Sequence, residues 1–173
     1  MNMDANIAEL RELVSWWGTY LDLDSIDWGE IEEAAGHPFP LDFKRFCMEF
    51  PPVAFQDALF IRHPESDFGV EDEWENVSRS VASFLELTPD FPFSIYPEPG
   101  RTLIPWGNYE EQIYFWWLAE GEPDDWSVVV TDGTGSQWEA FPGTMTDCLL
   151  ELLQGSQRLA ITEHLGGSPR FAG

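Results

Sequence analysis

The stretch that decides the fold runs from Leu103 to Phe141 and reads LIPWGNYEEQIYFWWLAEGEPDDWSVVVTDGTGSQWEAF. Its β-forming runs are interrupted by Gly-Asn, Pro-Asp-Asp and Asp-Gly-Thr-Gly, which are typical of tight turns. The stretch therefore predicts four consecutive antiparallel strands. From Ile113 to Leu118 both sets of alternating residues are apolar, so this strand should be buried on both faces. We expect it to be the central strand of the sheet.

Helices and short strands are predicted on either side of this stretch. Apolar residues at helical spacing, together with capping residues, predict helices over 5–17, from Ile26 to a stop at Gly36, over 39–50, over 71–86, and from Thr144 to Gly155. Short apolar runs predict further strands at 58–62 and 93–96. The sum is an α+β fold with N-terminal helices, a mostly antiparallel sheet of about five or six strands, and helices packed mainly on one face.

Length and composition indicate one folded domain spanning residues 1–173. The chain is 43% hydrophobic and contains nine Trp, so it can build a core although its formal charge is −24. Cys47 and Cys148 lie in apolar helical patterns, which favours buried thiols in a reducing compartment. Charged residues interrupt the N-terminal helix pattern, and no apolar run approaches the ~20 residues of a membrane span. We expect a cytoplasmic protein.

The charge balance restricts the class of partner. Thirty-two acidic residues against eight basic ones should repel nucleic acid and anionic membranes and speed encounter with a basic protein. An acidic surface that serves only solubility explains the same balance, so the net charge alone identifies no partner. Direct binding of nucleic acid or of a membrane is therefore not expected.

No catalytic or metal-binding motif is visible. The three histidines, His37, His63 and His164, lack the spacing of a local metal site and favour surface or capping roles. There is no nucleophile elbow and no phosphate-binding glycine loop. Carboxylate pairs with exposed Trp could in principle form a glycosidase cleft, but thirty-two acids produce such pairs by chance. We expect no enzyme activity, no cofactor and no metal.

Two groups of motifs resemble the SMI1/KNR4 family, also called SUKH. In IEEAAGHPFPLDFKRF, residues 31–46, an acidic helix that ends in glycine precedes an element similar to the family's L-P-x-D-[YF]-x-x-F. The second group comprises IPWG, YFWW and WSVVV, followed by Trp138 and Phe141, which lead through Pro-Gly-Thr into CLLELLQG. The resemblance covers approximately residues 26–155 and leaves 156–173 as a C-terminal extension.

The resemblance implies a SUKH-like α+β architecture and a non-enzymatic binding function. Many bacterial members look like immunity proteins that neutralise a cognate polymorphic toxin, often a nuclease, while the fungal namesake is a cell-wall signalling regulator. The first role fits the charge, because a basic nucleic-acid groove is complementary to an acidic protein. A regulatory or scaffold module that binds an endogenous protein is the alternative, and a carbohydrate-active enzyme is the third. The oligomeric state stays open.

The candidate partner-binding residues are the carboxylates of two acidic groups. One group lies between Glu65 and Glu75, where no base intervenes; the other lies in the turns of the main sheet. The first group also fits simple complementation of a helix dipole on a solvated face. The residues expected to accept Lys and Arg of a basic toxin domain are Asp67, Glu71, Asp72, Glu73, Glu110, Glu111, Glu122, Asp124 and Asp125.

Overall fold

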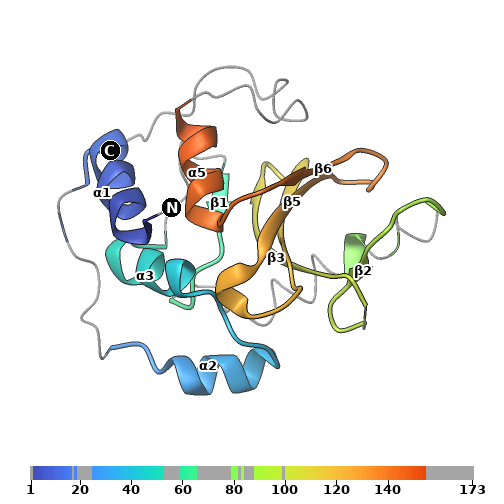
Figure 1. Cartoon of the computed structure of the whole chain (residues 1–173), viewed down its shortest axis with the longest axis horizontal. Coiled ribbons are helices and arrows are strands. Elements are labelled where there is room, and N and C mark those ends of the chain that lie inside the picture. The colour runs from blue at the N-terminus through green and yellow to red at the C-terminus, as the bar shows by residue number, and fades with distance from the viewer. Residues whose placement is uncertain are drawn as a thin grey trace.

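The computed structural model describes residues 2–16, 18, 25–52, 59–65, 79–81, 83, 88–98 and 100–154. The described strands form a six-stranded sheet in the order β1-β3-β4-β5-β6, with β2 beside β3 (Figure 1). All pairs are antiparallel except β2 with β3. The strands are β1 (Leu59–Ile61), β2 (Ser94–Ile95), β3 (Thr102–Tyr109), β4 (Ile113–Leu118), β5 (Ser127–Asp132) and β6 (Trp138–Phe141).

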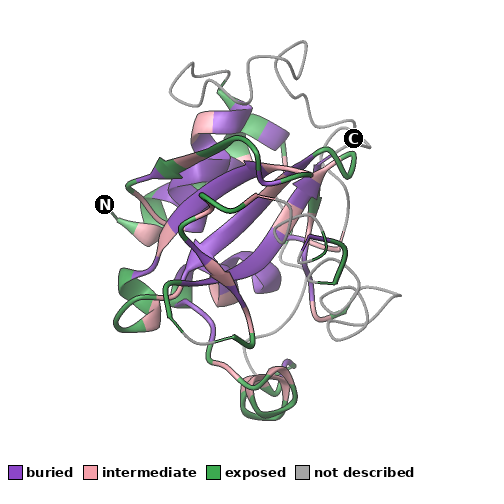
Figure 2. Ribbon diagram, turned by 90° about the vertical axis from the view of Figure 1, so that its right-hand side faces the viewer, coloured by how far each residue is buried: buried purple, intermediate pink, exposed green. Residues whose placement is uncertain are grey.

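The predicted central strand is confirmed. β4 lies between β3 and β5, and Phe115, Trp116 and Trp117 are completely buried. Phe115 and Trp117 belong to the core on one face, whereas Trp116 belongs to the core on the other face. Figure 2 shows the buried strands running through the middle of the molecule. The alternation of apolar side chains over both faces is what makes a strand central.

One predicted turn is wrong. Gly107 and Asn108 lie inside β3 and not between strands, and the reversal occurs after Tyr109. Gly107 is required there by close packing, because a Cβ at this position would lie 2.8 Å from the Phe60 carbonyl oxygen. It also adjoins the register shift between β3 and β4. Glycine in this strand therefore marks an irregularity and a close backbone approach.

Helices cover mainly one face of the sheet, as predicted. α1 (Met3–Val14), α3 (Leu41–Glu49) and α5 (Met145–Leu153) pack together on that face (Figure 1). α2 (Trp28–Ala35) contacts α3 through the Trp28 and Phe43 rings, whose centres are 6.0 Å apart. Gly36 ends α2 with φ of 77°, the left-handed conformation in which glycine is least strained. The predicted capping pair of Thr144 and Asp147 is a reciprocal capping box at the start of α5.

On the opposite face the described residues form a second, smaller core, to which one helical residue, Val81, contributes. Val81, Phe93 and Ile95 pack against the sheet residues Leu103, Trp116, Leu118 and Val129. Most of the predicted helix over 71–86 lies outside the described residues, although 79–81 and 83 are helical. The stop at Gly155 and the C-terminal extension also lie outside them. The fold is α+β, with the larger core on the helix side.

A buried polar network joins the N-terminal parts of three helices. The Asp42 carboxylate of α3 accepts from the Thr146 N–H at 3.0 Å and from its hydroxyl at 3.1 Å. The Asn6 amide of α1 donates to Asp147 at 2.6 Å and to Thr146 at 3.1 Å. Burial raises the pKa of Asp42, although the hydrogen bonds that Asp42 accepts from Thr146 oppose that shift. Carboxylates on this side of the protein thus satisfy the backbone of neighbouring helices.

Candidate partner-binding surfaces

The β3–β4 turn presents two of the predicted carboxylates. Glu110 and Glu111 occupy its central positions with φ of 48° and 56°, and both side chains are exposed. The Gln112 N–H donates to the Tyr109 carbonyl at 2.9 Å and closes the turn, so Glu110 and Glu111 are its two central residues. Positive φ at both central positions usually selects Asn-Gly, because other side chains are strained there. The Asn108 side-chain oxygen accepts from the Glu111 N–H at 3.1 Å, and the Tyr114 hydroxyl donates to the Glu111 carbonyl at 2.9 Å. Neighbouring side chains therefore hold this strained turn in place.

Negative charge at this turn is not compensated within the described part of the chain. No described Lys or Arg forms an ion pair with Glu110 or Glu111. Burial raises the pKa of Tyr114, and the charge of Glu111 raises it further. A cationic group brought to the turn would therefore meet two exposed carboxylates in an already negative field.

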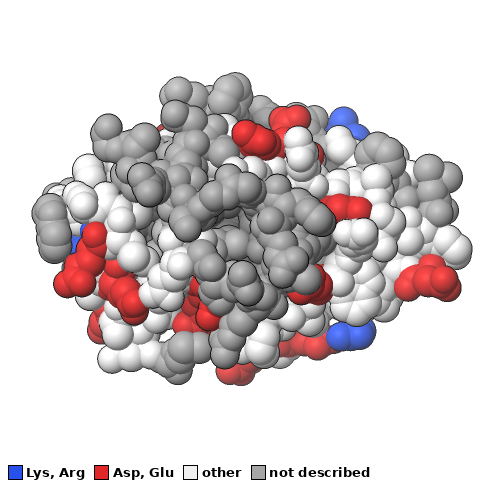
Figure 3. Space-filling view, turned by 90° about the horizontal axis from the view of Figure 1, so that it is seen from above, with Lys and Arg blue, Asp and Glu red and all other residues white. Residues whose placement is uncertain are grey.

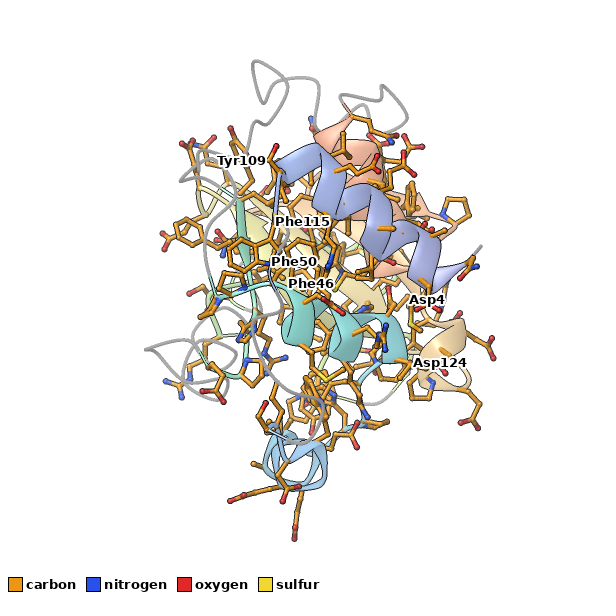
Figure 4. The ribbon with its side chains drawn as sticks, turned by 90° about the vertical axis from the view of Figure 1, so that its left-hand side faces the viewer. Asp4, Phe46, Phe50, Tyr109, Phe115 and Asp124 are labelled. Carbon is orange, nitrogen blue, oxygen red and sulfur yellow. The ribbon has the colours of Figure 1, made fainter. Side chains whose placement is uncertain are left out.

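The β4–β5 connection contains the other three predicted turn residues. Glu122, Asp124 and Asp125 are exposed in and beside the short 3-10 helix η1 (Pro123–Asp125). Asp124 accepts from the N–H of Leu41 at 2.8 Å and lies beside the first turn of α3 (Figure 4). Pro40 precedes α3 and supplies no side-chain cap. Asp124 is therefore a cap provided by a distant part of the chain, whereas Glu122 and Asp125 have no such bond among the described residues.

The two acidic turns do not form one surface. They lie at opposite ends of β4, which has six residues and spans about 20 Å at the usual rise of a strand. In Figure 3, carboxylates occur in several separate groups on the described part of the face shown. The remaining predicted residues, Asp67, Glu71, Asp72 and Glu73, lie outside the described residues. A partner that contacts both turns must extend across the protein.

Several basic residues of the described chain are already paired with acids. The pairs are Arg11 with Glu49, Lys44 with Glu32, Arg45 with Asp4, and Arg101 with Glu120. Arg62 is 5% exposed, and its guanidinium lies 5.4 Å from the centre of the Phe39 ring. The chain has eight basic and thirty-two acidic residues, so most carboxylates have no Lys or Arg to pair with even when every base forms an ion pair.

Trp138 is a further candidate residue for binding a partner, and it is not among the carboxylates predicted from the sequence. It is the first residue of β6, is 41% exposed, and contacts Phe93 edge to face with ring centres 5.0 Å apart. A large aromatic side chain that is both exposed and held by a neighbour is typical of interface hot spots. The signal in the sequence is the alternation in Trp138–Phe141, which places one aromatic residue on each face of an edge strand.

The histidines and cysteines have structural roles where they are described. The His63 ring is buried, and its Nε2 donates to the carbonyls of Cys47 and Phe50 at 2.7 and 3.1 Å, so its role is capping and not surface exposure. Burial lowers the pKa of His63. It also lowers the pKa of His37, to about 4. Cys47 and Cys148 are free, buried thiols whose pKa is raised by burial. His164 lies outside the described residues.

The described residues contain no cluster of His, Cys, Asp and Glu suited to a metal ion, and none of their helices has the length and apolar character needed to cross a membrane. Comparison of the chain with protein-family models, with curated proteins and with solved structures finds no match. The resemblance to SMI1/KNR4 proteins therefore stays a prediction based on the motifs quoted above.

Proposed function

We propose that this protein is a cytoplasmic, non-enzymatic binding protein that neutralises a basic protein partner, as an immunity protein neutralises its toxin. The observation that carries the proposal is the contrast between paired and unpaired charges. Arg11, Lys44, Arg45 and Arg101 are each paired with an acid, whereas Glu110 and Glu111 are exposed and form no ion pair with a described base.

Inhibition in this proposal is steric and electrostatic. The net charge of −24 attracts a positively charged domain and orients it during encounter. A nuclease toxin suits this attraction because nucleases bind polyanions through basic grooves. Glu110, Glu111, Glu122 and Asp125 would accept its Lys and Arg side chains and cover the groove. Asp124 has less freedom to take part, since its carboxylate already accepts from Leu41.

The test is a pull-down from the native host at low and then raised salt, followed by mass spectrometry and an activity assay. We expect a basic toxin domain that elutes with salt and whose activity the protein blocks. Capture of only endogenous regulatory or house-keeping proteins would contradict the immunity role and favour the regulatory alternative. Capture of nothing basic would contradict the partner chemistry itself.

Charge reversal then locates the contact. Glu110→Lys with Glu111→Lys should slow association and weaken its salt dependence, because two carboxylates of the turn become cations. The matched control is Glu12→Lys with Glu33→Lys, two exposed positions on α1 and α2 that give the same change in net charge. Equal association rates for the two double variants would remove the β3–β4 turn from the interface. Stopped-flow fluorescence over a salt series measures the difference.

A further inference from the structure

β6 is an edge strand of the described sheet, and two of its four residues, Trp138 and Ala140, are exposed. β6 lies at the end of the strand order and pairs only with β5 among the described strands (Figure 1). Natural edge strands are usually protected by proline, lysine or a bulge. The β6 sequence, Trp-Glu-Ala-Phe, has no proline or lysine, and its pairing with β5 is regular. Its one charged residue, Glu139, is half-buried on the face opposite Trp138.

The backbone of β6 places hydrogen-bonding groups on that edge. The Asp132 N–H donates to the Gln137 carbonyl at 3.0 Å, which makes these two residues a hydrogen-bonded pair. Such pairs alternate along an antiparallel ladder, so Trp138 and Ala140 occupy the positions that do not bond to β5. Their N–H and C=O groups consequently point away from the sheet. An added strand would find donors and acceptors at both residues.

Side chains next to this edge provide an apolar platform. Trp138 and Ala140 share the sheet face of their register partners Thr131 and Val129, and both are exposed. Trp138 rests against Phe93, which is itself buried. An apolar side chain of an added strand could therefore lie against the Trp138 ring while its backbone pairs with β6.

Charge decides what kind of strand fits. The β3–β4 turn lies beside the β5–β6 turn, because a Cβ on Gly133 would lie 3.7 Å from the Glu111 carbonyl oxygen. This end of the sheet thus brings Glu110, Glu111 and Asp132 near the start of β6, and neither turn contains a base. A second copy of this chain would bring another −24 charges and be repelled. A basic segment is complementary.

We propose that the outer edge of β6 binds an extended basic segment of the protein partner, which adds to the sheet as a further strand. Backbone bonds to Trp138 and Ala140 hold the segment, an apolar residue packs on Trp138, and its Lys or Arg residues face the carboxylates of the two turns. The inference rests on the proposed function, since it names the part of the basic partner that docks and the place where it docks.

The test uses the full chain and an octapeptide of alternating lysine and valine, followed by amide NMR. We expect the peptide to slow hydrogen exchange of the Trp138 and Ala140 N–H groups by about tenfold or more, because these groups gain acceptors. Two matched peptides should give no such protection. One carries glutamate in place of lysine, and the other carries proline in place of valine, which removes the backbone donors.

Variants separate edge pairing from simple charge attraction. Ala140→Pro removes an outward N–H, which an edge strand tolerates, and should weaken peptide binding about tenfold. Trp138→Ala should weaken it by a similar factor. Phe60→Ala is the matched control, because Phe60 is 45% exposed on β1 at the opposite edge of the sheet. Unchanged binding by both β6 variants would overturn the inference, as would protection of a different strand.

The same variants distinguish this inference from the proposed function. If the wild-type chain captures a basic toxin and Ala140→Pro captures it equally well, the edge inference fails while the immunity role stands. If no basic partner is captured yet the lysine peptide protects Trp138 and Ala140, the immunity role fails, while the β6 edge is still shown to accept a basic strand. Self-association through β6, seen by sedimentation and abolished by Ala140→Pro, would make a second copy the occupant and overturn the inference.

Discussion

Carboxylates on the helix-covered side of the protein differ from those at the β3–β4 turn in what they bind. Asp42, Asp147 and Asp124 each accept from a backbone N–H at the start of a helix. No described residue donates to the side chains of Glu110 and Glu111, which sit on a strained backbone. Some carboxylates of this acidic chain therefore accept hydrogen bonds at helix N-termini, whereas others are exposed at the β3–β4 turn. Carboxylates of the first group stabilise helix N-termini, whereas those of the second group are exposed.

The largest effect should come from Asp147. Asp147→Ala removes the acceptor for the Thr144 N–H and for the Asn6 amide, both in or near the buried network. We expect the free energy of unfolding to fall by about 2–4 kcal/mol, since a helix cap and a buried hydrogen bond are lost together. Urea denaturation measures it. Glu110→Ala should change the free energy of unfolding by less than about 0.5 kcal/mol. An equal loss for Asp147→Ala and Glu110→Ala would contradict the difference between capping and exposed carboxylates.

A smaller effect should separate two adjacent residues of the β4–β5 connection. Asp124→Ala removes the cap on α3, and we expect a loss of about 1 kcal/mol in the free energy of unfolding. Asp125→Ala, the matched control, has no such bond among the described residues and should be nearly neutral. Thermal and urea unfolding of both variants provide the comparison. Similar destabilisation by the two changes would show that Asp124 is not a cap.

The smallest effect on stability should come from relieving the β3–β4 turn. Glu110→Asn with Glu111→Gly installs the preferred residues for two positive φ angles, and we expect a gain of about 0.5–1 kcal/mol. The same variant should associate more slowly with a basic partner, because both carboxylates are gone. Asp125→Gly, in a segment with ordinary helical φ, should bring no gain. A variant that is stabilised and still associates at the wild-type rate would exclude the turn as a binding site.

Much of the fold follows from local patterns. The two-faced apolar alternation from Ile113 to Leu118 predicts the central strand, Gly36 predicts the end of α2, and Thr144 with Asp147 predicts the capping box, all as observed. Each of these signals depends on backbone geometry within a few residues, which the sequence reports directly. The prediction of a turn at Gly107 was wrong because this glycine is needed for close packing against β1, which lies more than forty residues earlier in the chain.

The candidate site was predictable in composition but not in arrangement. The sequence alone determined that the protein is acidic and that carboxylates occupy the turns around β4. The predicted antiparallel order also placed these turns at opposite ends of β4, but only the tertiary structure decided that Asp124 caps α3 and that Trp138 lies exposed on an edge strand. The physical reason is that charge and periodicity are properties of neighbouring residues, whereas exposure and hydrogen bonding depend on which distant segments the fold brings together.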